Sequence, residues 1–193
     1  MRILKYGFLG EDDAQKIFLK NYLGAFGSTD FSFEFDENFP LKAKDRNSVL
    51  KRFTEAIQLG ISVYQQDIFF VGIDLDDSEQ AKLFSLFEEM KAQINPRFKD
   101  QTCIFIPIQC IEHWLWYLKM KKANPNITKN EIIEKQPRPK AKEIVYGSKR
   151  PSNEVSNPIV DSLSKDTDIE WLENRSESFR HFHGQVKLLL FKL

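Results

Sequence analysis

Three aspartates stand at the end of the most apolar stretch of the chain. Residues 68–73 (IFFVGI) are followed by Asp74, Leu75, Asp76 and Asp77. Side chains alternate along a strand, so Asp74 and Asp76 are expected to point the same way. Two neighbouring carboxylates repel each other unless a cation lies between them, and oxygen ligands favour hard ions such as Mg²⁺ or Mn²⁺. The spacing therefore predicts a divalent metal site.

The same acids also allow a structural interpretation. Asp77 and Ser78 precede Glu79 as the cap and first turn of a helix would. Capping explains Asp77 and Ser78, but it leaves Asp74 and Asp76 unexplained.

The elements that must position these acids alternate between strands and helices. Apolar runs predict strands over residues 3–9, 31–35, 67–73 and 102–107, and helical periodicity begins near residues 14, 48, 79 and 109. This order predicts βαβ units with right-handed crossovers. We therefore expect an α/β fold with a mostly parallel sheet flanked by helices.

The regular pattern fades after residue 120. Residues 136–140 (QPRPK) are expected to be exposed and extended. Short helices are expected from 157 or 158 to about 163, from about 167, and from 176 to 190. The sequence predicts an α/β core over residues 1–122, followed by a basic linker and helical C-terminal part over 123–193, packed on the core as one compact unit.

Further carboxylates follow other strands. Glu11 comes after the first strand, and Glu112 opens the helix after the fourth. The carboxyl ends of parallel strands share one edge of a sheet, so both acids could meet the Asp74 and Asp76 pair there. Each acid taken alone is better explained as a surface residue than as part of a site. Together, the four suit metal-assisted attack on a phosphodiester.

Composition sets the remaining limits. The chain has 193 residues, 41% hydrophobic, with a formal net charge of zero, which argues against a constitutive nucleic-acid binder. Residues 119–150 nevertheless hold ten Lys and Arg against three Glu, which suits a polyanionic partner or a solvated surface segment. The first residues lack the apolar run of a signal peptide and no apolar run reaches about 18 residues, so neither a signal peptide nor a membrane span is expected. Two cysteines, Cys103 and Cys110, suggest a reduced cytoplasmic protein.

Two other kinds of chemistry are less well supported. Cys110 and His113 could form a thiol nucleophile with its base, but no third group that would orient the histidine is visible. Residues 7–10 (GFLG) lack the Lys-Ser/Thr of a P-loop, so the protein is not expected to be an NTPase itself.

Four segments together carry a resemblance to a known family. They are residues 10–15 (GEDDAQ, against E-G-x-T-E), 107–115 (PIQCIEHWL, against I-P-x-x-x-x-E-x-W-L), 139–146 (a P-K…Y stretch) and 175–179 (RSESF, against R-S-x-S-F). With a Glu after the first strand, a D-x-D after a central strand and the expected sheet order, the chain resembles the Toprim fold. Through the four segments it more closely resembles the small Toprim-like proteins of bacterial defence loci, including the RloB-like group and domain of unknown function 4276, which are related to OLD-type nucleases.

The resemblance implies a Toprim-like nuclease that depends on Mg²⁺ or Mn²⁺. Glu11, Asp74 and Asp76 would hold the metal, with Glu11 also able to act as general base. In the same comparison, Glu112 would complete the catalytic site. Lys140 or Lys142 would stabilise the charge that develops on the phosphate.

The resemblance also implies a biological setting. Such a nuclease would cleave RNA or DNA as the effector or toxin of an anti-phage defence system, with a partner ATPase of AAA or ABC type. Asp12 and Gln15 depart from the family pattern, which favours the alternative of a non-catalytic interaction or regulatory subunit that binds the ATPase. Primase-like synthesis is a third reading, disfavoured because no zinc module is visible. No membrane partner is expected, and a homo-oligomer remains open.

Overall fold

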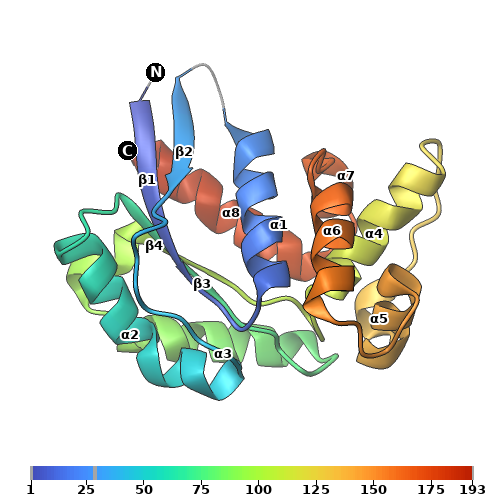
Figure 1. The fold of residues 1–193 in the computed structure, drawn as a ribbon, viewed down its shortest axis with the longest axis horizontal. Helices are drawn as coiled ribbons and strands as arrows, with labels where there is room; N and C mark the ends of the chain where they lie inside the picture. Colours follow the sequence, from blue (N-terminus) through green and yellow to red (C-terminus); the bar gives the residue numbers. More distant parts are fainter. Residues whose placement is uncertain (1, 28–29, 193) are drawn as a thin grey trace.

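A four-stranded parallel sheet forms the centre of the computed structural model, which describes residues 2–27 and 30–192 (Figure 1). Helices follow each strand, as the predicted βαβ pattern requires. The elements in chain order are β1 (Arg2–Leu9), α1 (Asp13–Phe26), β2 (Phe31–Phe35), α2 (Arg46–Ser62), β3 (Ile68–Gly72), α3 (Gln80–Gln93), the 3₁₀ helix η1 (Pro96–Gln101), β4 (Thr102–Phe105), α4 (Glu112–Ala123), the 3₁₀ helix η2 (Ile133–Lys135), α5 (Arg138–Tyr146), α6 (Asn153–Ser164), α7 (Ile169–Glu173) and α8 (Glu177–Lys192).

The strand order is β2-β1-β3-β4, so β1 and β3 are central. All the pairings between these strands are parallel, with Leu9 opposite Val71 and Gly72 opposite Phe105. Every residue of β3 is buried, as expected for a strand covered on both faces. The prediction of an α/β fold with a parallel sheet, flanking helices and a helical C-terminal part is confirmed.

A hydrophobic cluster lies on each face of the sheet. On one face, Phe53 of α2 and Leu83 of α3 belong to the same cluster as Phe69 of β3. On the other face, Phe70 of β3 belongs to a cluster with residues of α1 and of α4 to α8, among them Trp114. Figure 1 shows α2 at the lower left and α3 along the bottom, with α1 near the centre and α4 and α6 on the right. The three layers leave the strand ends uncovered by helix bodies, where loops can carry a site.

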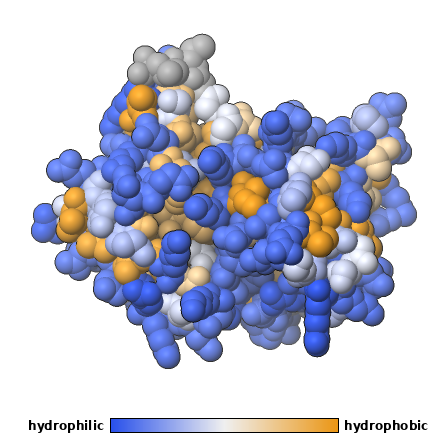
Figure 2. Space-filling view, in the orientation of Figure 1, coloured by the Kyte–Doolittle hydropathy of each residue, from blue (hydrophilic) through white to orange (hydrophobic). Residues whose placement is uncertain are grey.

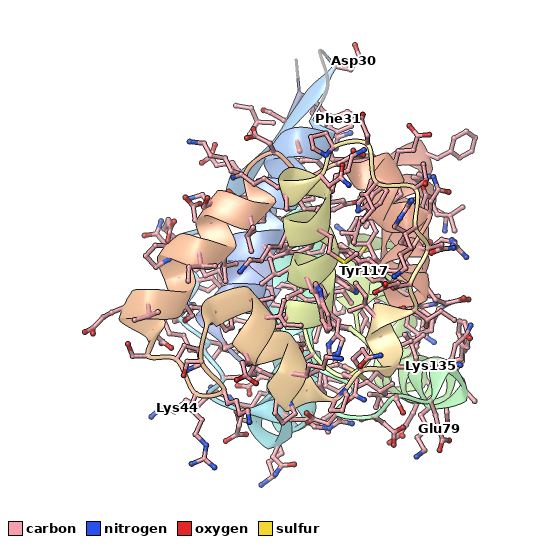
Figure 3. The ribbon with its side chains drawn as sticks, turned by 90° about the vertical axis from the view of Figure 1, so that its right-hand side faces the viewer. Asp30, Phe31, Lys44, Glu79, Tyr117 and Lys135 are labelled. Atoms are coloured by element: carbon pink, nitrogen blue, oxygen red, sulfur yellow. The ribbon has the colours of Figure 1, made fainter. Side chains whose placement is uncertain are left out.

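The chain after residue 123 contributes to the larger of these clusters. Val160, Leu172 and Phe182 are buried in it. Tyr117 of α4 lies among the helices in Figure 3, and its hydroxyl donates to Glu131 O at 3.0 Å and accepts from Ile133 N at 2.9 Å. These bonds fasten the segment that leads into α5, which delivers basic residues to the sheet edge.

The edge strand β4 is covered by a side chain. Gln185 of α8 donates from Nε2 to Ile104 O at 2.8 Å and accepts from Ile104 N at 3.0 Å. This amide pairs with the strand as a neighbouring peptide group would. It blocks one of the positions at which an exposed edge could pair with another chain.

Three local predictions were wrong. The segment over 136–140 is not extended throughout, because α5 begins at Arg138 with a proline in its first turn, where the missing N–H costs nothing. Helix α6 begins at Asn153 and contains Pro158, rather than starting there. Neither Asp77 nor Ser78 is the N-cap of α3: Glu79 takes that position, and Asp77 Oδ1 accepts from Glu79 N at 2.9 Å.

The visible surface is largely polar. Figure 2 shows a mostly hydrophilic face on which apolar side chains form separate patches. Within residues 2–27 and 30–192, no helix is both long enough and apolar enough to cross a bilayer.

Candidate functional site at the carboxyl edge of the sheet

Glu11 and Asp74 meet where β1 and β3 end. Leu9 pairs with Val71, so the loops that follow the two strands leave the sheet side by side. Glu11 Oε1 accepts a hydrogen bond from Asp74 N at 2.6 Å. The first acid after β1 is thereby fixed against the acid that follows β3.

Asp74 is the buried centre of the site. It is 1% exposed, and its Oδ1 accepts from Gln15 Nε2 at 2.9 Å and from Ile111 N at 3.3 Å. Its Oδ2 faces Arg138 Nη2 at 3.3 Å. Side chains or backbone from α1, the loop before α4, and α5 therefore converge on one carboxylate.

Gln15 joins the two acidic loops. It is fully buried, and its Oε1 accepts from Glu11 N at 3.0 Å while its Nε2 donates to Asp74. A Cβ added to Gly10 or Gly72 would lie 2.7 or 2.8 Å from Gln15 Oε1, so two glycines make room for the amide. Gln15 suits this position because an uncharged amide can both accept from one loop and donate to the other.

The backbone of the second aspartate is unusual. Asp76 has φ 58° and Gln109 has φ 65°, in the left-handed region that non-glycine residues seldom adopt. Asp76 N donates to Gln109 O at 3.1 Å, and Gln109 N donates to Asp77 O at 3.0 Å. Since β3 ends at Gly72, strand alternation does not orient Asp74 and Asp76 as the sequence analysis assumed.

Two arginines hold this loop from outside. Arg138, the first residue of α5, forms ion pairs with both Asp74 and Asp76. Arg46, the first residue of α2, donates to the carbonyls of Asp74 and Leu75, the latter at 3.0 Å. Sequence reasoning missed both roles. The excess of basic residues over 119–150 could have pointed to Arg138. No feature of the sequence pointed to Arg46.

Glu112 lies on the neighbouring side of the cluster. It is 3% exposed at the first position of α4, and its Oε1 lies 3.4 Å from Lys142 Nζ. Lys140 turns elsewhere: its Nζ donates to Gln136 Oε1 at 2.9 Å and lies over the Trp116 ring. Of the two candidate lysines, the structure brings Lys142 to the carboxylates.

Burial and mutual repulsion perturb these acids. Burial, followed by the charges of Glu112 and Glu11, raises the pKa of Asp74 well above its usual value. Burial likewise raises the pKa of Glu11 to about 7, with Asp76 and Asp12 adding to the effect. The pKa of Asp12 is also raised, chiefly by burial. Perturbed carboxyls gathered at one edge are typical of functional sites.

The thiol at this edge is unsuited to nucleophilic catalysis. Cys110 Sγ lies 3.3 Å from His113 Nδ1, the pairing that a thiol mechanism needs. However, burial and the charges of Glu112 and Asp74 raise the pKa of Cys110, and burial lowers that of His113. Both groups are therefore neutral, and His113 Nε2 lies 2.8 Å from the carbonyl oxygen of Gln136 in the connection to α5.

The side chains of Glu11, Asp74 and Asp76 are of the chemical type that binds a hard divalent cation. They offer carboxylate oxygens only, and burial together with the neighbouring acids raises the pKa of Glu11 and of Asp74. Arg138 at present compensates Asp74 and Asp76. In the part of the chain that the structure describes, no three His, Cys, Asp or Glu side chains are arranged to hold a metal ion. Binding would therefore require side chains to shift, with Arg138 turning away.

Comparison with known proteins adds no relative. No protein-family model matches the chain, and searches of curated proteins and of solved structures also find no match.

Proposed function

We propose that this protein is a metal-dependent nuclease that hydrolyses phosphodiester bonds of RNA or DNA. The observation that carries the proposal is Asp74, a buried carboxylate at the carboxyl edge of the sheet whose backbone N–H donates to Glu11 Oε1 at 2.6 Å. Burial, followed by the charges of Glu112 and Glu11, raises its pKa. A fold gains no stability from such an arrangement. Binding of a cation and a substrate phosphate would explain why the carboxylates are gathered there.

The proposed ligands of Mg²⁺ or Mn²⁺ are Glu11, Asp74 and Asp76. The ion would polarise the phosphate and stabilise the leaving oxygen. Glu11, whose pKa is about 7, can accept a proton from an attacking water near neutral pH.

Two cationic side chains at the cluster would bind the substrate phosphate. Lys142 pairs with Glu112 on one side of the cluster, and Arg138 pairs with Asp74 and Asp76 on the other. Each can turn from a carboxylate toward an incoming phosphodiester, because both side chains are partly exposed. Positive charge placed beside developing negative charge is an effective contribution to catalysis.

The biological setting is proposed from the motif resemblance alone. It is the role of a cytoplasmic effector or toxin in an anti-phage defence system, working with a partner ATPase of AAA or ABC type. The basic segment over residues 119–150 supports contact with nucleic acid.

One observation favours a second function. Arg138 closes directly on Asp74 and Asp76, so the acids are neutralised without any metal. A Toprim-like domain held in this way could serve as a non-catalytic interaction or regulatory subunit of an ATPase.

Thermal denaturation with Mg²⁺ and with Mn²⁺ separates the two functions. The wild type, the double variant Asp74→Asn/Asp76→Asn, and Asp166→Asn as an exposed control would be compared. An ion at about 100 times its dissociation constant stabilises the folded state by about 2.7 kcal/mol. The nuclease proposal expects this gain in the wild type and control but not in the double variant, together with Mn²⁺-dependent cleavage of an oligonucleotide.

Two outcomes would count against the nuclease. An equal gain in the double variant would place the ion elsewhere. No gain and no cleavage of single-stranded or duplex RNA or DNA would favour the interaction subunit.

A further inference from the structure

A second pocket adjoins the acidic cluster. The first turns of α1, α4 and α6 and the end of α5 surround it. It shares a wall with the cluster, because Ile111 N donates to Asp74 and Glu112 follows directly. Its lining includes Asp12, Glu112, Lys142, Tyr146, Arg150 and Asn153.

Two polar atoms in the wall of this pocket lie close together without a hydrogen bond of normal geometry. Among the described residues, Glu112 Oε2 and the Tyr146 hydroxyl make no such bond, although the residues are only 3% and 7% exposed. The two side chains are near enough that Glu112, after burial, raises the pKa of Tyr146, so a small hydroxyl between them would reach both. An ionised carboxylate only accepts, while a phenol can donate and accept. A buried polar group left unsatisfied costs more than a hydrogen bond returns. The two atoms therefore point to a ligand group that donates to one and accepts from the other.

The mouth of the pocket is suited to an anion. Lys149 and Arg150 are exposed there. Lys149 Nζ lies 3.8 Å from Glu143 Oε2 in an exposed ion pair, whereas no ion pair of Arg150 is found within residues 2–27 and 30–192. Helix α6 starts directly afterwards, and Ser152 at its N-cap position makes no side-chain capping bond. Backbone N–H groups at a helix start favour a phosphate.

We propose that this pocket binds one ribonucleotide unit of an RNA strand. The strand phosphate lies at the start of α6 between Lys149 and Arg150. The 2′-hydroxyl donates to Glu112 Oε2 and accepts from Tyr146, a pair of bonds that deoxyribose cannot make. Lys142, whose side chain is partly exposed over Glu112, turns toward the phosphate and uncovers the carboxylate oxygen.

This inference rests on the proposed function and narrows its substrate class to RNA. The pocket would hold the nucleotide beside the bond at which Glu11 and Asp74 act. Because a hydroxyl adjacent to a phosphate is the recognised chemistry, the base is not read here.

Fluorescence anisotropy with matched labelled RNA and DNA oligonucleotides of one sequence tests the proposal. EDTA keeps the metal out, so binding is measured without cleavage. The variants are Glu112→Gln and Tyr146→Phe, with Tyr64→Phe as a control for loss of a phenol outside this pocket, and thermal denaturation verifies that each is folded.

The wild type and Tyr64→Phe should bind RNA about tenfold more tightly than DNA, the effect of one hydrogen bond to a charged group. Glu112→Gln and Tyr146→Phe should lose most of that preference. Arg150→Ala should weaken both nucleic acids equally. Equal affinity for RNA and DNA in the wild type, no binding of RNA, or a preference unchanged in Tyr146→Phe would overturn the proposal.

The nuclease proposal can fail separately. If the wild type preferred RNA, the two variants lost that preference, and no cleavage occurred in Mn²⁺, the pocket would be an RNA-binding site and the nuclease proposal would be wrong. If RNA and DNA were cleaved alike and bound with equal affinity, the nuclease proposal would stand and the ribonucleotide pocket would be wrong.

Discussion

Glu11→Gln is expected to stabilise the metal-free protein at neutral and alkaline pH. The glutamine keeps an oxygen that can accept from Asp74 N, the bond Glu11 makes at 2.6 Å. It removes a negative charge that lies close to those of Asp76 and Asp12. The substitution therefore relieves repulsion and desolvation while it keeps the hydrogen bond.

The size of the effect follows from the pKa. Burial raises the pKa of Glu11 from 4.5 to about 7, and a difference of one in pKa corresponds to about 1.4 kcal/mol. Removing the charge of Glu11 completely would therefore raise the free energy of unfolding by about 3 kcal/mol. Solvent screening at this partly exposed side chain reduces the expected gain to about 1–2 kcal/mol.

The sign of the pH dependence is fixed by the same values. The folded protein holds the Glu11 proton more tightly than the unfolded chain does, so this group lowers stability as pH rises from about 4.5 to about 7. The advantage of Glu11→Gln should be absent below pH 4.5, grow across that interval, and stay constant above it.

Urea denaturation at a series of pH values from 4.5 to 8, with EDTA present, measures this difference. Glu55→Gln, an exposed change on α2, is the matched control and should show little dependence. If Glu11→Gln were less stable than the wild type at pH 8, or gained equally at every pH, the account of a repelling acidic cluster would be refuted.

Three further changes probe the surroundings of the site. Arg138→Gln should lower the free energy of unfolding by about 3 kcal/mol, because it leaves the buried Asp74 uncompensated, and excess Mg²⁺ in the denaturation assay should restore most of the loss. Gln15→Leu should cost about 1–3 kcal/mol in the same assay, since it removes both bonds that join the acidic loops. Gln185→Ala should expose Ile104 on the β4 edge and cause concentration-dependent association in size-exclusion chromatography.

Much of the fold could be predicted because strands and helices have distinct periods. Strand β3 is apolar on both faces, and its six-residue run marks it as central. The sequence does not reveal α5 and predicts too late a start for α6, because proline is also typical of extended chain and of a helix start. The packing of α6 against α1 outweighs the local cost of Pro158.

The site was only partly accessible to sequence reasoning. Topology was enough to place Glu11 beside Asp74, since β1 and β3 end together. The left-handed turn at Asp76 and the ion pairs of Arg138 arise from contacts between distant segments, which no local pattern reveals. Tyr146 was noticed only within a motif, and its unpartnered hydroxyl depends on how α5 packs near Glu112.

Another buried acid in this protein shows why the cluster is better explained by function than by stability. Glu134, 5% exposed, accepts from Ser176 Oγ at 2.8 Å, from Glu177 N at 3.0 Å and from Ser178 Oγ. Its oxygens are satisfied at the start of α8, where a helix favours negative charge. This fold can therefore bury a carboxylate and satisfy it fully. At the sheet edge it instead gathers acids that repel one another and leaves an oxygen of Glu112 unpartnered, as a site for a cation and a substrate would require.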